Sequence, residues 1–271
     1  MYRPCGAIFS SVDVRDYKMV CATPKMEFPE RFELDIMPIK DQGNVGRCVA
    51  TALSSIIEFY DYNQNGIDVE MSPGYIYGNR GNSDHKGPGM IMRDALDVVS
   101  KYGDVHSYEF PYDVEAPEII DHYEQNAERL YEVGYPHRIS EYCRVNTVAA
   151  AKFALMSGIP LLMAMEWYED MCVNHDGVLT TEYVGYAGGH CMYIYGWNEH
   201  GWLVANSWGS EWGVNGCFTL PYHMGMAECW AVMDNIIEGA YVKKPFQSKV
   251  GKRIAKIVNA VFNTFSWSKN N

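Results

Sequence analysis

Apolar residues recur at helical spacing over the first half of the chain. One such stripe follows Cys48 and consists of Val49, Leu53, Ile56, Ile57 and Tyr60. Caps and glycine stops predict further helices, one capped by Ser72 and opened by Pro73, and others over 91–101, 117–133 and 146–157. The first four of these helices predict a helical lobe over residues 41–145.

From residue 160 onward the pattern changes to short apolar runs bounded by turn residues. These runs predict strands over 160–167, 190–197, 202–206, 216–220 and 230–233. The pair Asn215-Gly216 predicts a tight turn at the fourth strand. The pattern therefore predicts a mainly β lobe over residues 146–240 and an α+β fold class.

Composition and charge fit a folded, acidic body. The 271 residues are 48% hydrophobic and 14% aromatic, enough for one large core or for two half-size lobes that face one cleft. The net charge is −12, and because the chain from residue 240 onward carries +7, the rest carries −19. This distribution argues against a nucleic-acid partner.

The basic tail, residues 241–271, predicts an amphipathic helix over 249–265. Its apolar face consists of Val250, Ile254, Ile257, Val258, Val261, Phe262 and Phe265. Three interpretations stay open: packing on the acidic body, association with a membrane surface, and docking to a partner protein. No window approaches the length of a transmembrane helix, and we expect a monomer.

Three separated motifs carry candidate chemistry. They are Gln42 to Cys48, Gly188-Gly189-His190, and Asn206-Ser207-Trp208-Gly209. A thiol, an imidazole and an amide are the groups that a Cys-His-Asn nucleophilic site requires. Cys48 begins its predicted helix, where unpaired backbone N–H groups lower a thiol pKa.

These motifs resemble the papain-like cysteine peptidases over roughly residues 30–240. Gln42 lies six residues before Cys48, and Asn206 lies sixteen residues after His190. The resemblance implies a papain-like two-lobe fold with a helical lobe, an antiparallel β-barrel-like lobe and an active cleft between them. The style is that of compact bacterial and viral members, to judge from residues 11–17, 37–42 and 72–73.

The resemblance also implies a role for each matched residue. Cys48 would be the nucleophile, His190 the general base and later acid, and Asn206 the amide that orients His190. Gln42 would donate its side-chain N–H to the oxyanion, beside the backbone N–H of Cys48. Trp208 would cover the His190–Asn206 hydrogen bond from water.

Substrate contacts follow from position matching with the family. The candidates are Gly87, Gly89, Ile91, Ala164, Gly188, Gly189, Trp208 and Asp234. The loop over 87–89 resembles the wall that pairs with substrate backbone, while Ile91, Ala164 and Gly188 would line an apolar pocket for the residue two before the scissile bond. Asp234 lies near the position of an acidic pocket floor that admits Arg or Lys in some relatives, so a basic preference also stays open.

Three positions depart from the family's pattern. Val45 replaces the usual disulfide-forming cysteine, and Val49 replaces the tryptophan after the nucleophile. Arg47 stands where a small residue is usual, and either its charge would help to hold the thiolate or its bulk would narrow the cleft.

The eight cysteines bear on metal binding and compartment. They include no C-x-x-C pair and no Cys/His spacing typical of zinc, so we expect neither a metal nor a cofactor. One catalytic cysteine leaves an odd number, which favours a reducing interior. The apolar run at the N-terminus is too short for a signal peptide, so we expect a cytoplasmic protein, with leaderless export as an open route.

Residues 1–40 form an N-terminal strap before the helical lobe. Pro24, Pro29 and the run over 12–17 are typical of extended chain. One interpretation places residues 1–28 in the cleft as an inhibitor, and the other packs them on the surface.

These observations predict a cysteine endopeptidase that hydrolyses polypeptides through a thioacyl-enzyme on Cys48. One alternative keeps the Cys-His chemistry but transfers acyl groups to amines or cleaves other amides. Another is a catalytically silent papain-like binding or scaffold protein, which Arg47 and Val49 favour.

Overall fold

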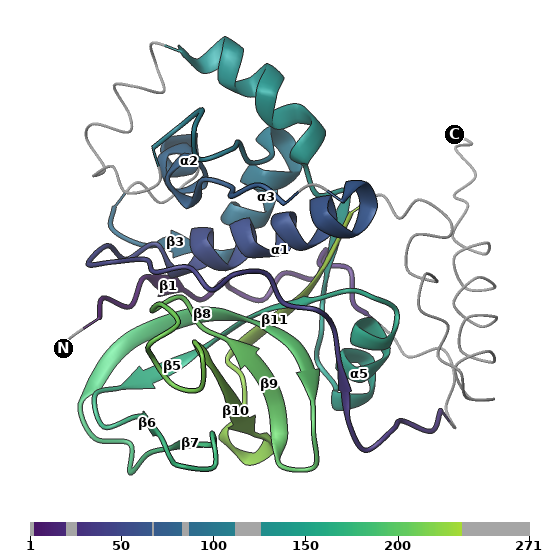
Figure 1. Ribbon diagram of the computed structural model, residues 1–271, viewed down its shortest axis with the longest axis vertical. Helices are drawn as coiled ribbons and strands as arrows, with labels where there is room; N and C mark the ends of the chain where they lie inside the picture. The colour runs from purple at the N-terminus through teal and green to yellow at the C-terminus, as the bar shows by residue number, and fades with distance from the viewer. Residues whose placement is uncertain (1–2, 20–25, 67, 83–86, 112–125, 235–271) are drawn as a thin grey trace. The chain divides into compact units, whose positions relative to one another are not determined.

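A helical lobe and a sheet lobe lie side by side in the part of the chain that the computed structural model describes (Figure 1). This part comprises residues 3–19, 26–66, 68–82, 87–111 and 126–234, within one compact unit, Met1–Asn235. The basic tail and the helix expected over 249–265 lie outside the described residues.

The helical lobe confirms the helices expected after Cys48, after Ser72 and over 91–101, while residues 117–125 of the helix expected over 117–133 lie outside the described residues. It contains α1 (Cys48–Asn65), α2 (Pro73–Gly78), α3 (Met92–Tyr102) and helical residues 126–134, together with the 3₁₀ turns η1 (Asn79–Asn82) and η2 (Tyr135–His137). Ser72 caps α2 by accepting the N–H of Tyr75 at 3.2 Å. α1 ends at Gly66, whose φ of 68° suits a glycine.

α1 is buried more completely than an amphipathic stripe implies. Every residue from Cys48 to Asp61 is buried, because α2 and α3 pack on one side of the helix and β8 (Tyr186–Trp197) packs on the other. The polar side chains that this burial encloses require partners. Glu58, for example, accepts the ammonium of Lys40 at 2.6 Å and the N–H of Met71 at 2.6 Å.

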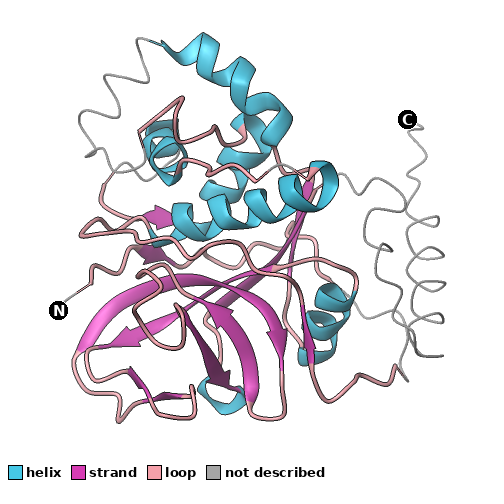
Figure 2. Ribbon diagram, in the orientation of Figure 1, coloured by secondary structure: helices cyan, strands magenta, loops and turns pink. Residues whose placement is uncertain are grey.

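The β lobe is built on an antiparallel seven-stranded sheet (Figure 2). Its order is β10 (Cys217–Pro221), β9 (Gly201–Ala205), β8, β5 (Leu161–Tyr168), β11 (Glu228–Met233) and β4 (Glu141–Arg144), with β2 (Phe32–Glu33) also beside β8. The smaller elements are the pair β6 (Cys172–Val173) and β7 (Leu179–Thr180), the helix α5 (Val148–Met156) and the turn η3 (Tyr222–Met224). The predicted turn is present, with φ of 52° at Asn215 and 80° at Gly216.

The sheet begins earlier in the chain than the expected lobe boundary at residue 145. β4 pairs with β11, and β2 pairs with β8, so residues 32–33 and 141–144 belong to the β lobe. Phe32 also stacks on Trp197, with ring centroids 5.1 Å apart. None of the helices in the described ranges has the length and hydropathy that a membrane span requires.

Candidate active site

Cys48 lies at the N-terminus of α1, where that helix meets the β lobe. Its thiol is buried, and the backbone N–H groups of Cys191, Gly6, Val49 and Cys48 itself lie near enough to lower the pKa of the thiol. Because Cys191 directly follows His190 on β8, these contacts bring the two motifs together across the lobe boundary. Arg47, the N-cap of α1, is 2% exposed, so its side chain is buried rather than presented to the solvent.

His190 is held by an amide and by two indoles. Its Nε2 lies 2.7 Å from Oδ1 of Asn206, and the same Oδ1 accepts the N–H of Ser207 at 2.8 Å. Oδ1 is therefore the acceptor, Nε2 carries the proton, and Nδ1 keeps the lone pair. Trp208 stacks on the imidazole at 4.6 Å between centroids, and Trp167 meets its edge at 5.1 Å.

Gln42 is fixed at both ends of its side-chain amide. Its Oε1 accepts the hydroxyl of Ser207 at 2.6 Å, and its backbone N–H donates to the Ser207 carbonyl at 2.7 Å. Its Nε2 donates to the carbonyls of Val45 at 2.9 Å and Pro4 at 2.8 Å. The second of these acceptors belongs to the N-terminal strap.

Residues 3–9 of the strap, which we call the cleft segment, run between the lobes across this site. The carbonyl of Gly6 accepts the N–H of Met90 at 2.8 Å, and β1 (Ala7–Ile8) pairs in parallel with β3 (Met90–Ile91). On the other wall, a Cβ at Gly189 would lie 2.2 Å from the Ala7 carbonyl oxygen. Backbone of the cleft segment thus fills the space in front of Cys48.

Gly6 is the tightest point of the cleft segment. A Cβ built on Gly6 would lie 1.8 Å from the carbonyl oxygen of Gly46, two residues before the nucleophile. A Cβ on Gly89 would lie 2.6 Å from the Gly6 carbonyl oxygen. The close approach of these backbones explains why positions 6 and 89 are glycine, whereas a Cβ on Gly46 would come no closer than 3.4 Å to Gly6.

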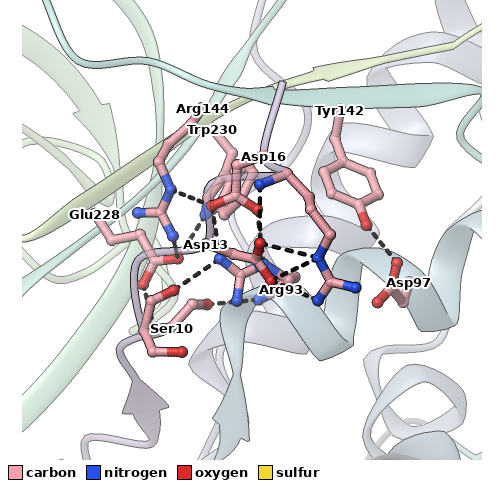
Figure 3. A network of polar contacts seen from close by, with 11 residues as sticks. Ser10, Asp13, Asp16, Arg93, Asp97, Tyr142, Arg144, Glu228 and Trp230 are labelled. Atoms are coloured by element: carbon pink, nitrogen blue, oxygen red, sulfur yellow. Dashed lines mark hydrogen bonds and ion pairs between the residues drawn. The ribbon is translucent and has the colours of Figure 1, made fainter. Parts of the chain in front are cut away.

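Ion pairs anchor the strap on both sides of Cys48. Arg3 binds Asp41 at 2.6 Å, and the N–H of Ser10 donates to Glu228 at 2.6 Å. Figure 3 shows Asp16 between Arg93 of α3 and Arg144 of β4, at 2.6 Å and 3.0 Å. One carboxylate of the strap therefore binds both lobes.

Burial moves the pKa values of the thiol and the imidazole in opposite directions. It raises the pKa of Cys48 against the opposing effect of the backbone donors, and it lowers the pKa of His190 to about 4, which the Asn206 contact only partly offsets. Nδ1 of His190 is buried and makes no hydrogen bond within the described ranges. The covered site therefore holds a neutral thiol and a neutral imidazole at pH 7.

The expected substrate residues divide into those that contact the cleft segment and those that do not. Gly89, Ile91, Gly188 and Gly189 contact or pair with it. Ala164 is fully buried in β5, opposite Cys191 and Glu228. The carbonyl of Gly87 accepts Nε of Arg80 at 3.1 Å.

The prediction that Asp234 forms a pocket floor in the cleft is wrong. Its Oδ2 accepts Nε2 of Gln64 at 3.0 Å, and Gln64 lies sixteen residues after Cys48 on α1. At 1.5 Å per residue, that separation is roughly 24 Å along the helix. Asp234 instead lines a surface pocket with Gln64, Tyr135 and Ser140.

Sequence reasoning missed Glu228 as the carboxylate of this region. Glu228 pairs with Ala164 in the sheet register, is 3% exposed, and binds Ser10, Trp230 and Arg144. A carboxylate inside the apolar strand over 228–233 was the available signal, because a buried charge requires partners. Among the described residues, no group of three or more His, Cys, Asp or Glu side chains is placed to hold a metal ion.

Comparison with known proteins agrees with the geometry. The sequence model of the papain family cysteine proteases matches residues 25–236. The chain belongs to the papain family. The uncharacterized peptidase C1-like protein L477 of Acanthamoeba polyphaga mimivirus is 31% identical over 202 residues, which cover 67% of this chain and 63% of that protein.

The chain is also similar to an animal protein in sequence and to a bacterial cysteine protease in fold. Rat procathepsin L is 28% identical over 213 residues, 71% of this chain and 60% of that protein, so the chain spans about three-fifths of the length of these curated relatives. Among solved structures, Xylellain from Xylella fastidiosa matches with a TM-score of 0.71 at 22% identity, covering 86% of this chain and 98% of that one. The viral and bacterial relatives agree with the compact style of the sequence.

Proposed function

We propose that the chain is a papain-family cysteine endopeptidase that is latent while the cleft segment lies in its cleft. One observation carries the proposal. Cys48, His190, Asn206 and Gln42 converge on one buried site, and backbone of the chain itself occupies the space that a substrate would need. Asn206 already holds the imidazole of His190, and Ser207 already holds the side-chain amide of Gln42.

The mechanism uses these four residues in sequence. Sγ of Cys48 attacks the scissile carbonyl carbon after passing its proton to Nδ1 of His190, the nitrogen left free by the Asn206 contact. Nε2 of Gln42 and the backbone N–H of Cys48 bind the oxyanion. His190 then protonates the leaving amine, and a thioester remains on Cys48. Water deprotonated by His190 hydrolyses the thioester and frees the thiol.

The cleft segment differs from a substrate in the direction in which its chain runs through the cleft. Residues before a scissile bond would lie along the wall over 87–91, and residues after it would lie beyond Gln42. The cleft segment runs the other way, because Arg3 and Pro4 lie at the Gln42 side while Ala7 and Ile8 pair with β3. It therefore covers the site without presenting a bond in the orientation for attack.

Thiol labelling of the full-length chain tests the proposal. The variant Gly6→Ala adds a methyl group where Gly46 leaves no room, so the cleft segment is displaced. We expect an epoxysuccinyl inhibitor to label Gly6→Ala about 5- to 150-fold faster than the wild type, since overpacking of this kind costs about 1–3 kcal/mol. Ser11→Ala, at an exposed strap position, should behave as the wild type.

The controls separate the alternatives. Gly6→Ala/Cys48→Ala should take up no label, which assigns the adduct to Cys48. A folded Gly6→Ala variant that neither labels nor cleaves peptides would contradict the proposal in favour of a silent scaffold. Equal labelling rates for wild type and Gly6→Ala would support Cys48 as the nucleophile but would contradict the proposed latency. Amide products in the presence of added amines, rather than acids, would point to acyl transfer.

A further inference from the structure

Arg3 lies in an acidic and aromatic pocket at one end of the cleft. Its guanidinium makes a two-point contact with Asp41, Nη1 to Oδ1 at 2.6 Å and Nη2 to Oδ2 at 3.2 Å. The pocket has a volume of about 620 Å³, and its lining includes Glu169, Glu211, Trp208 and Trp212. Carboxylates and indole faces together are the groups that bind a guanidinium or ammonium.

The position of this pocket relative to the nucleophile follows from the cleft segment. The Pro4 carbonyl accepts a hydrogen bond from Nε2 of Gln42, Gly6 lies next to Cys48, and Ala7 pairs with β3. Arg3 is therefore on the opposite side of Gln42 from β3. In the proposed mechanism that side receives the residues that follow the scissile bond.

The backbone around Asp41 holds its carboxylate in place. Oδ1 accepts the N–H of Gly43 at 2.9 Å, and Asp41 forms an isolated antiparallel bridge with Trp208. Because Gln42 is the next residue, the carboxylate lies one residue from the oxyanion donor. Among the described residues that line the pocket Arg3 is the one base, and its partner Asp41 lies beside that lining. Departure of Arg3 therefore leaves a site of negative charge.

We infer that this pocket selects a lysine or arginine at the first or second position after the scissile bond, with Asp41 as the specificity-determining carboxylate. The inference rests on the proposed peptidase function. In the covered form Arg3 occupies the seat that a basic substrate residue takes in the uncovered form. Asp41 binds the substrate side chain directly, and its partner changes from Arg3 to the substrate.

A pair of peptide series tests the inference in full-length Gly6→Ala. Quenched fluorescent peptides differ only at the first or the second residue after the cleavage site, which is Arg, Gln or Glu. We expect kcat/KM for the arginine peptide to exceed that for glutamine about three- to five-fold at one of the two positions, with glutamate lowest. The Asp41 side chain is 47% exposed, and an ion pair of this kind contributes up to about 1 kcal/mol. The ratio is internal, so a general change in activity cancels.

Asp41→Asn in the same background should reduce the arginine-to-glutamine ratio to about one. Asp35→Asn, at an exposed aspartate outside the pocket lining, should keep the ratio. A ratio near one before any Asp41 substitution, or a preference that survives Asp41→Asn, would overturn the inference. If Gly6→Ala takes up the epoxysuccinyl label but cuts no arginine peptide, the inference is wrong while the nucleophile stands; failure to label refutes both.

Discussion

At the scale of single residues, the cleft segment acts on the chemistry through burial. His190 and Cys48 are both fully buried, and their pKa values move so that the neutral forms are favoured. A thiolate–imidazolium pair requires the opposite shifts. In the proposed mechanism, removal of the cleft segment admits water to both groups and takes the Gly6 N–H away from the thiol, so uncovering and activation would be one event.

The pH dependence of uncovering follows from His190. Its pKa is about 4 in the covered form against an ordinary 6.5, so between these values only the uncovered form binds the proton. Stability of the covered form is present above about pH 6.5 and is lost as pH falls toward 4. At pH 5.5 we expect the uncovered population to rise about ten-fold.

The labelling rate of wild type divided by that of Gly6→Ala, at each pH, measures this population and cancels the titration of the thiol itself. At alkaline pH the population depends on Cys48, because its raised pKa makes the covered form lose stability as pH rises above 9.0. A ratio that stays constant between pH 7 and 5 would contradict the assignment to His190.

Substitutions of Gln42 and Ser207 distinguish the side chain that donates to the oxyanion from the side chain that positions this donor. In the Gly6→Ala background, Gln42→Ala should lower kcat about 100- to 1000-fold with KM nearly unchanged, because the oxyanion exists only beyond the ground state. Ser207→Ala removes the hydroxyl that fixes Oε1 of Gln42 at 2.6 Å, and should cost far less, about ten-fold. Steady-state kinetics on one peptide check both, and an equal loss in the two variants would count against the assignment of the donor.

Sequence reasoning located the convergent residues better than the peripheral ones. Cys48, His190, Asn206 and Gln42 lie in motifs whose order and spacing could be read directly. Asp234 was placed by position matching with the family, and such matching fails when the strand register is unknown. Glu228, which pairs with Ala164, could be recognised only once β5 and β11 were aligned.

At the scale of elements, side chains beyond the cleft segment add to the backbone pairing that attaches the strap. Asp16 is 7% exposed and binds Arg93 and Arg144, and those guanidinium groups hold its pKa below the ordinary range against the effect of burial. Because the pKa of Asp16 is lowered, its carboxylate stays ionised and the ion pairs persist down to acidic pH. Asp16 therefore stays charged across the range in which His190 titrates.

Asp16→Asn should weaken this attachment. Loss of one charge leaves Arg93 and Arg144 without their shared carboxylate, and we expect labelling of Cys48 to accelerate about ten-fold. Asp13→Asn is the matched control, because Asp13 pairs with Arg15 inside the strap. Intact-mass labelling of both full-length variants provides the comparison. Equal rates for Asp16→Asn and wild type would show that backbone pairing alone holds the strap.

Element boundaries show where a single sequence is insufficient. α1, α2 and α5 were predicted closely because caps and glycine stops are local signals. β2 and β4 were not predicted, because strands of two to four residues are too short to show an alternation of apolar and polar side chains. Their pairing partners β8 and β11 also lie far along the chain. β8 begins at Tyr186, before the glycine pair, because the strap and β5 supply its neighbours.

At the scale of the molecule, the strap connects the two lobes across the cleft. Arg93 lies on the helical lobe and Arg144 on the β lobe. In the cleft segment, Gly6 contacts the helical-lobe wall at Gly46 and Gly89, and Ala7 contacts the β-lobe wall at Gly189. The attachment is intramolecular, which gives the strap an effective concentration near the millimolar range. Weak individual contacts are therefore sufficient to keep the cleft covered.

A peptide of residues 3–19 should restore the cover in trans. Added to Gly6→Ala, it should slow labelling of Cys48 only at concentrations well above those of the protein, because the covalent connection is absent. The same peptide carrying Gly6→Ala should have no effect, since Gly46 excludes its methyl group. Inhibition by both peptides would mean that the attachment depends on charge alone.

The parallel pairing of β1 with β3 has a kinetic consequence. A chain seated backwards in its own cleft cannot be digested by the molecule that it covers, so covered molecules are stable in isolation for as long as they stay covered. The first cut in any strap must then come from a second molecule that is already uncovered. Conversion of a pure population of covered molecules to the uncovered form should start with a lag. The lag should shorten as protein concentration rises, and also when a trace of uncovered enzyme is added.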